Sequence, residues 1–212
     1  MNRPEKIKSK TQLLVEGNDQ RNFFRAFIGH LAIEDIQIHN FGGVPDLKRF
    51  LRAFANGPGF RESVQSIGIV RDAEKSAASA FESVQSSLEQ AGLSVPEHPE
   101  TPSAGKPSVN VLILPGRGES GMLETLLCKT FAGTPEDDCV NSFFECIAEA
   151  GVGESRRPAK ARAWAYLTTK PDPHHSVGYA TAKGYWGDLD QPVFSIVRDF
   201  LTSLEQSDVP SK

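Results

Sequence analysis

A short apolar run that leads directly into an acid and a glycine most constrains how this chain can fold. In TQLLVEGNDQRNFF (11–24), the run LLV is followed by Glu16 and Gly17. Apolar residues then recur at helical spacing as far as Leu31. The segment predicts a strand, a tight turn and a helix, with Glu16 and Asp19 just beyond the strand. Open α/β sheets bind their ligands at the carboxyl ends of their strands, so these two acids are candidate site residues.

The same arrangement recurs further along the chain. The run SIGIV (66–70) has no charged residue, which predicts a central strand buried on both faces. Asp72 and Glu74 follow it. Carboxylates at adjacent strand ends repel one another, and a bound Mg²⁺ or Mn²⁺ relieves that repulsion. Such an ion can orient a phosphodiester and lower the pKa of a bound water, so the pattern indicates a divalent-cation site.

The order of the expected elements indicates the fold class. Two further strands are expected at 35–40 and 109–114, and helical spacing is found between the strands. This alternation predicts an α/β fold with a parallel, Rossmann-like sheet of about four strands and helices on both faces. Further helices are expected at 136–150, 159–169 and 192–205.

A single domain is the simplest interpretation of this order. Its expected parts are a flexible N-terminus (1–10), an α/β core (11–132), a mainly helical extension (133–206) and a tail (207–212).

Two loops are expected between these elements. The segment 95–108 contains four prolines, which favours a surface loop or a mobile hairpin tip. The polar segment 170–187 is expected to be a loop, and its His174 and His175 to be exposed rather than metal ligands. Aromatic residues lie on either side of it. We expect Trp164, Tyr166, Tyr185 and Trp186 to pack in the core or as anchors rather than to stack on bases.

Composition restricts the location and the partners. The net charge of −4 does not favour indiscriminate binding to polyanions, although basic residues gather at 48–52 and 156–162. We interpret each basic group as a solvated helix face more readily than as a phosphate track. No apolar run approaches the roughly 20 residues that span a bilayer, and the polar, basic N-terminus is unlike a secretory signal. The three cysteines form no C-x-x-C pair, so a reducing cytoplasm is expected.

The acidic segments also resemble a known family. LLVEGNDQ and IGIVRDAE resemble the two acidic motifs of the Toprim domain, which topoisomerases, bacterial primases, small maturation ribonucleases and the overcoming-lysogenization-defect (OLD) nucleases share. One position departs from the pattern, because Glu74 stands where the second motif has Asp. The blocks LPGRGESGMLETLL (114–127) and 160–194 resemble later segments of small, stand-alone Toprim-like bacterial proteins. The resemblance extends from about Thr11 to Leu204.

The resemblance implies a role for each of several side chains. Glu16 would be the acid/base residue or a metal ligand, Asp72 and Glu74 would be metal ligands, and Asp19 would assist at the metal. Glu124 would be the acid of the third block, and Lys160 would stabilise charge on a phosphate. Glu119 is a weaker candidate, because an acid in the first turn of a helix is often a cap.

Three functions are compatible with this pattern. The first is Mg²⁺- or Mn²⁺-dependent phosphodiester chemistry on DNA or RNA, as in a Toprim-type nuclease. The second is a non-catalytic metal- or nucleotide-binding module that acts through a partner such as an ATPase. It is motivated by Glu74 and by the lack of a G-x-x-x-x-G-K-[ST] phosphate loop, since the OLD nucleases carry an ATPase domain. The third is a metal-free relic of the fold.

Overall fold

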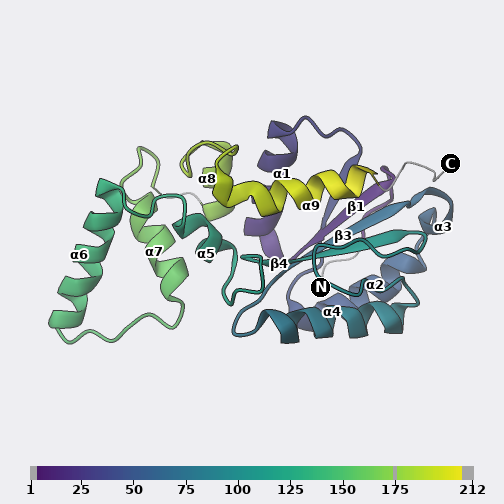
Figure 1. Cartoon of the computed structure of the whole chain (residues 1–212), viewed down its shortest axis with the longest axis horizontal. Coiled ribbons are helices and arrows are strands. Elements are labelled where there is room, and N and C mark those ends of the chain that lie inside the picture. Colours follow the sequence, from purple (N-terminus) through teal and green to yellow (C-terminus); the bar gives the residue numbers. More distant parts are fainter. Residues whose placement is uncertain (1–3, 174–175, 207–212) are drawn as a thin grey trace.

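Four parallel strands form the sheet at the centre of the molecule (Figure 1). The computed structural model describes residues 4–173 and 176–206. The strand order is β2-β1-β3-β4, and every neighbouring pair is parallel. The strands are β1 (Thr11–Val15), β2 (Ile36–Asn40), β3 (Ser66–Asp72) and β4 (Ser108–Leu114). The predicted α/β class and the parallel four-stranded sheet are therefore confirmed.

The register of the sheet brings the two acidic strand ends together. Val15 of β1 pairs with Val70 of β3 on one side and with Asn40 of β2 on the other. Glu16 therefore follows β1 at the level where β3 reaches its final residues, which end in Asp72. Every residue of β3 is buried except Asp72, which is half-buried, as expected of a central strand.

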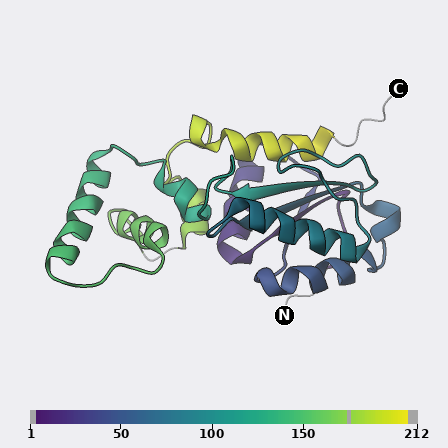
Figure 2. The ribbon, with the colours of Figure 1, turned by 60° about the horizontal axis from the view of Figure 1, so that its bottom comes forward.

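Helices cover both faces of the sheet (Figures 1 and 2). Helices α1 (Gly17–His30) and α9 (Ser195–Gln206) pack on one face, and α2 (Leu47–Ala55) and α4 (Ala77–Ala91) pack on the other. The short helix α3 (Phe60–Ser63) and two 3₁₀ turns, η1 (Val44–Asp46) and η2 (Pro192–Phe194), complete these layers. Helix α9 lies directly on β3, since a Cβ atom at Gly68 would stand 2.6 Å from the Leu204 side chain.

The proline-rich segment 95–108 follows the free edge of the sheet. The amide of Glu100 donates to the carbonyl of Val111 at 2.8 Å, and the amide of Ser103 donates to that of Val109 at 2.8 Å. Both acceptors belong to β4, the edge strand. The segment is thus a surface loop, as expected, and it covers part of an edge that would otherwise be available for pairing with another chain.

A helical extension lies beyond the carboxyl end of the sheet. It contains α5 (Leu123–Cys128), α6 (Pro135–Glu149), α7 (Pro158–Leu167) and α8 (Val177–Ala182). The term extension refers to these four helices from here on; it includes α5 and leaves out α9, which packs on the sheet, and so differs from the expected range 133–206. In Figure 1, α6 and α7 lie at the far left, away from the sheet. Phe131, Tyr166 and Trp186 stack inside the extension, and the rings of the first two are 4.0 Å apart between centroids. Core packing of Tyr166 and Trp186 is confirmed, whereas Trp164 is 55% exposed and the expectation for it was wrong.

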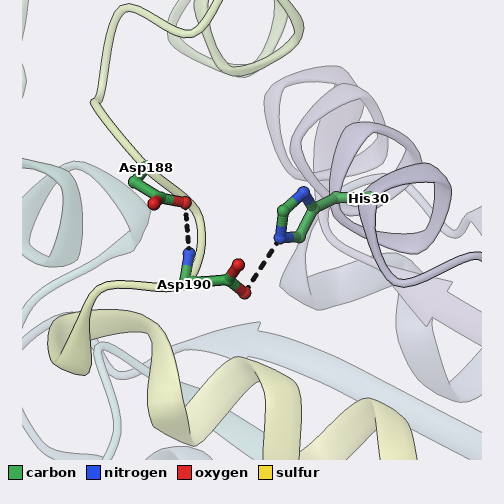
Figure 3. A group of neighbouring side chains, drawn as sticks. All are labelled: His30, Asp188 and Asp190. Carbon is green, nitrogen blue, oxygen red and sulfur yellow. Dashed lines mark hydrogen bonds and ion pairs between the residues drawn. The ribbon is translucent and has the colours of Figure 1, made fainter.

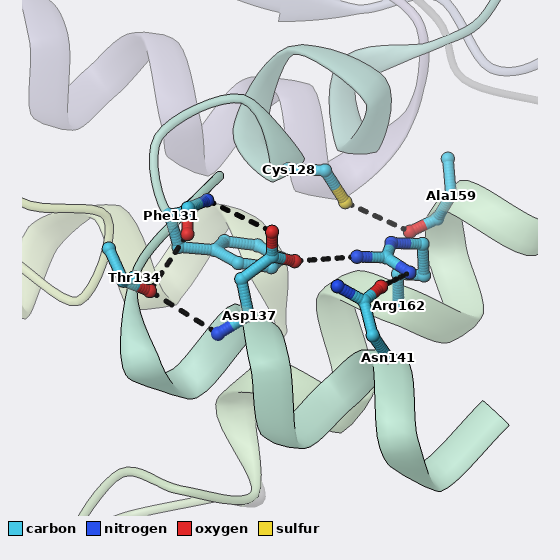
Figure 4. Close-up of polar contacts among 8 residues, drawn as sticks. Cys128, Phe131, Thr134, Asp137, Asn141, Ala159 and Arg162 are labelled. Atoms are coloured by element: carbon cyan, nitrogen blue, oxygen red, sulfur yellow. Dashed lines mark hydrogen bonds and ion pairs between the residues drawn. The ribbon is translucent and has the colours of Figure 1, made fainter. Parts of the chain in front are cut away.

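Polar contacts fix α7 against its neighbours (Figure 4). The Arg162 guanidinium donates to Asp137 Oδ1 at 2.6 Å and to Asn141 Oδ1 at 2.7 Å, both on α6. On the other side, the Cys128 thiol at the end of α5 donates to the carbonyl of Ala159 at 3.5 Å. These contacts hold α7 in one orientation, which determines where its outward side chains lie.

The predicted loop 170–187 was wrong in part, because α8 forms within it. Ser176 caps the helix by accepting a hydrogen bond from the amide of Tyr179 at 3.2 Å. Packing on α1 rather than strong helix propensity stabilises this short segment, which explains why its sequence did not indicate a helix. His174 and His175 lie outside the described residues.

Two expectations about the whole chain can be compared with the structure. None of the helices in the described residues is long and apolar enough to cross a membrane. The three cysteines are free thiols.

Candidate functional site

The tight turn after β1 positions Glu16. Its amide donates to Gln20 Oε1 at 2.9 Å, and the amide of Gly17 donates to Asn40 Oδ1 at 3.0 Å. The same oxygen of Asn40 accepts from the amide of Gly42 at 2.8 Å. Gly17 has φ +85°, a left-handed conformation that glycine adopts without steric cost. Two amide side chains thus hold the backbone turn that presents the Glu16 carboxylate.

The Glu16 carboxyl group is half-buried at this turn. Its Oε2 atom is buried and has no hydrogen-bond partner among the described residues. Burial raises the pKa of Glu16, and the nearby charge of Glu74 adds to that effect. The backbone of Asp72 and the Arg71 guanidinium act in the opposite direction on this pKa. A buried, unpartnered carboxylate oxygen is costly unless something else binds it.

Asp72 lies at the centre of the acidic edge. Its Oδ1 atom accepts one hydrogen bond from Gln20 Nε2 at 2.9 Å and another from the amide of Leu123 at 3.0 Å. Gln20 therefore connects the ends of β1 and β3, because its other amide atom binds the backbone of Glu16. Burial, followed by the neighbouring charges of Glu16 and Glu124, raises the pKa of Asp72 to about 8.

Glu124 and Lys160 reach the same edge from the helical extension. Glu124, in the first turn of α5, is 5% exposed, and its charge contributes to the raised pKa of Asp72. Lys160 of α7 places its Nζ atom 3.4 Å from Glu124 Oε1. The extension thus adds one buried acid and one cation to the acids at the strand ends.

Glu74 has an unusual backbone conformation. Its φ is +53°, which is uncommon for a residue other than glycine. Two backbone hydrogen bonds to Gly121, of 2.7 and 2.8 Å, hold it in place beside the start of α5. The side chain is exposed, yet its charge acts on the pKa values of both Glu16 and Asp72. Glu74 therefore lies at the solvent side of the acidic edge.

Two other acids considered from the sequence have different partners. Asp19 Oδ1 accepts from the amide of Gly178, at the start of α8, at 3.5 Å. It therefore contacts a helix of the extension, and it does not cap its own helix, whose N-cap is Glu16. Glu119 forms an ion pair with Lys129 at 2.7 Å on the surface.

The acids at the sheet edge are neighbours without being a closed ligand cage. Among the residues that the structure describes, no three of these acids bring ligand atoms within 4.8 Å of one another. His30, Asp188 and Asp190 do so (Figure 3), but all three are exposed. Hydrogen bonds within that group already explain its proximity, since His30 Nε2 lies 3.0 Å from Asp190 Oδ1 and the amide of Asp190 donates to Asp188 at 2.9 Å.

The sequence did not single out Gln20, Asn40 or Arg71 as members of this site. Gln20 is 2% exposed. The signal that the sequence offered was an amide residue four positions after Glu16, in the first turn of the expected helix. Arg71 is also buried; its Nη1 atom donates to the carbonyl of Ala80 at 3.0 Å, while its Nε atom has no partner among the described residues. The contacts of Asn40 with Gly17 and of Gln20 with Asp72 join residues far apart in the sequence, so no local pattern indicated them.

A family comparison covers nearly the whole chain. The family model described as "Protein of unknown function (DUF3226)" matches residues 10–206. The chain belongs to this family. A solved structure of the C-terminal region of the OLD protein of Xanthomonas campestris pv. campestris is similar over 94% of this chain and 93% of that chain, with 15% identity and a TM-score of 0.47. No curated protein matches the chain.

Proposed function

We propose that this protein is a Mg²⁺- or Mn²⁺-dependent phosphodiesterase that acts on nucleic acid, a nuclease of the Toprim type. The observation that carries the proposal is the environment of Asp72. Burial of this carboxyl, and then the charges of three other carboxylates on two different parts of the fold, raise its pKa to about 8. Concentrating acids at a strand end destabilises the folded chain, and a divalent cation offsets that cost.

The residues fit such an ion by their chemistry. Carboxylate oxygens are the ligands that Mg²⁺ and Mn²⁺ prefer, and Glu16 Oε2 is buried with no partner among the described residues. Asp72, Glu16 and Glu124 would hold the ion, and Glu74 would reach it from the solvent side, directly or through water. Asp19, in the first turn of α1, would assist at the metal. A bound ion would orient a phosphodiester and neutralise charge that develops on it.

The chain's own side chains supply the remaining parts of the chemistry. The raised pKa of Glu16 brings this carboxyl closer to neutral pH, where an acid/base group transfers protons most effectively. Lys160, 3.4 Å from Glu124, would contact a phosphate bound at the same edge. The likeness of LLVEGNDQ and IGIVRDAE to Toprim motifs supports nucleic acid as the substrate, and the free cysteines support a cytoplasmic location.

Cleavage assays test this proposal. Single- and double-stranded DNA and RNA would be incubated with the purified chain in Mg²⁺, in Mn²⁺ and in chelator. We expect metal-dependent cleavage of at least one polymer, and a loss of about 100-fold or more in Glu16→Gln and Asp72→Asn because each removes a charge from the site. Asp190→Asn is the matched control, since it removes an exposed acid elsewhere. Normal cleavage by both site variants would refute the assignment.

One observation favours a second function. Among the described residues, no three of the predicted acids have ligand atoms within 4.8 Å of one another, and the Glu74 side chain is exposed. A non-catalytic module that binds a metal or nucleotide and acts through a partner such as an ATPase needs no finished catalytic geometry. Intact metal binding with no cleavage of any of the four polymers would favour this module.

A further inference from the structure

Helix α7 presents an exposed tryptophan beside the candidate site. Trp164 is 55% exposed, although tryptophan side chains are mostly buried in folded proteins. The buried side of α7 is formed by Ala163, Tyr166 and Leu167, which dock the helix without it. The chain's other tryptophan, Trp186, is 1% exposed and packs inside the extension. The Trp164 ring is thus available to a ligand.

The exposed ring continues a line that starts at the acidic edge. Lys160 lies 3.4 Å from Glu124, and its Nζ atom lies 5.5 Å from the centroid of the Trp164 ring. Lys160 and Trp164 are four residues apart within α7 and share one face of the helix, and Arg157 is the N-cap residue just before it. The ion pair of Lys160 with Glu124 places this face beside the acids.

Charge distinguishes this surface from that around Phe143, another exposed aromatic residue of the extension. Phe143 is 53% exposed on α6, whose first turn carries three acids. Trp164 instead follows Arg156 and Arg157, and among the described residues no acidic side chain forms an ion pair with either arginine. An exposed ring on a helix that begins at two arginines without ion pairs suits a polyanion that also has flat, apolar faces, whereas a ring on a helix that begins with acids does not.

We infer that Trp164 stacks on an unpaired base of single-stranded nucleic acid, next to a phosphate held by Lys160 and Arg157. The inference rests on the proposed function for its place beside the phosphodiester chemistry, and it makes that function specific for single strands or unpaired ends. In a duplex both faces of each base are already stacked on neighbours. A single strand can place one base on the ring while its backbone lies along the cations of α7.

Binding of a labelled dT oligonucleotide in chelator tests the inference without any requirement for cleavage. Fluorescence anisotropy gives the Kd. We expect Trp164→Ala to weaken binding about 10-fold and Trp164→Phe to weaken it less, because stacking on one aromatic ring contributes a factor of this order. The oligonucleotide should also quench the tryptophan fluorescence of the wild type, and Trp164→Phe should abolish this quenching, since Trp186 is buried. The matching duplex should bind more weakly than the single strand.

The control is Phe143→Ala, which removes a comparably exposed ring from the acidic helix and should leave the Kd unchanged. Circular dichroism would establish that each variant is folded. A change of less than about twofold in Trp164→Ala, or an equal effect of Phe143→Ala, would overturn the inference and assign the ring to a protein contact. Cleavage lost in Asp72→Asn, together with binding unchanged in Trp164→Ala, would retain the proposed nuclease and reject the stacking. Trp164-dependent binding without metal-dependent cleavage would retain the stacking and reject the proposed nuclease.

Discussion

At the scale of the residue, one amide side chain unites the two acidic strand ends. Gln20 accepts a hydrogen bond from the backbone of Glu16 and donates one to Asp72, with both distances 2.9 Å. Its donor group satisfies one oxygen of the Asp72 carboxyl, which leaves the remaining oxygen for a ligand. The conformation of the turn and the position of the central acid therefore depend on the same side chain.

Asp72 makes the stability of the metal-free chain depend on pH. Its pKa rises from 3.8 to about 8 on folding, so the folded chain retains a proton that the unfolded chain releases. Stability therefore decreases as pH rises from about 4 to about 8. Asp72→Asn removes this loss and can still accept the two hydrogen bonds at Oδ1. In chelator at pH 8 we expect the variant to be more stable than the wild type by on the order of 1–3 kcal/mol, with a smaller difference at pH 5.

Urea denaturation at both pH values measures the effect. Asp190→Asn should show no such gain, because a hydrogen bond from His30 lowers the pKa of Asp190 rather than raising it. An Asp72→Asn variant that is less stable than the wild type at pH 8 would show that the carboxyl is not destabilised by its neighbours.

The positions of Glu16 and Asp72 at the sheet edge could be predicted from the sequence because each lies at the end of a strand whose apolar run is clear, whereas Glu124 was expected only from the family resemblance. Glu16 and Asp72 end buried strands, and the register of a parallel sheet must bring such ends together. The contacts of Gln20 with Asp72 and of Asn40 with Gly17 could not be predicted, because each joins elements far apart in the sequence.

At the scale of the element, the contact between α1 and α8 leaves no room for added volume at Gly178. A Cβ atom at Gly178 would stand 2.0 Å from the backbone carbonyl oxygen of Asp19, and a backbone atom cannot rotate away. This close approach also places the amide of Gly178 near the Asp19 carboxylate. The sequence could not show that α8 forms here, because a glycine in a short segment reads as a turn unless its packing partner is known.

Gly178→Ala should therefore lower the free energy of unfolding by about 1–3 kcal/mol, since overpacking forces the two helices apart. The matched control is Gly29→Ala on α1, where a Cβ atom meets nothing within 4 Å. We expect that control to be neutral or to gain about 0.5–1 kcal/mol, because alanine favours helix over glycine. Thermal unfolding of both variants provides the comparison, and equal stability of Gly178→Ala and the wild type would contradict the close packing.

At the scale of the whole molecule, the α/β core and the helical extension each supply part of one site. The core contributes Glu16, Asp72 and Glu74, whereas the extension contributes Glu124 and Lys160. The sheet and most helices could be predicted from apolar spacing. The placement of α7 could not, because it depends on the contacts of Arg162 and on the aromatic stack inside the extension.

The most direct test of the central claim is a titration of the chain with Mn²⁺, in which electron paramagnetic resonance measures the free ion. We predict that the wild type binds Mn²⁺, that Asp72→Asn binds it at least about 10-fold more weakly, and that Asp190→Asn binds it like the wild type. Wild-type affinity in Asp72→Asn would contradict the account. So would a loss of binding in Asp190→Asn alone, which would place the cation beside His30 instead of at the edge of the sheet.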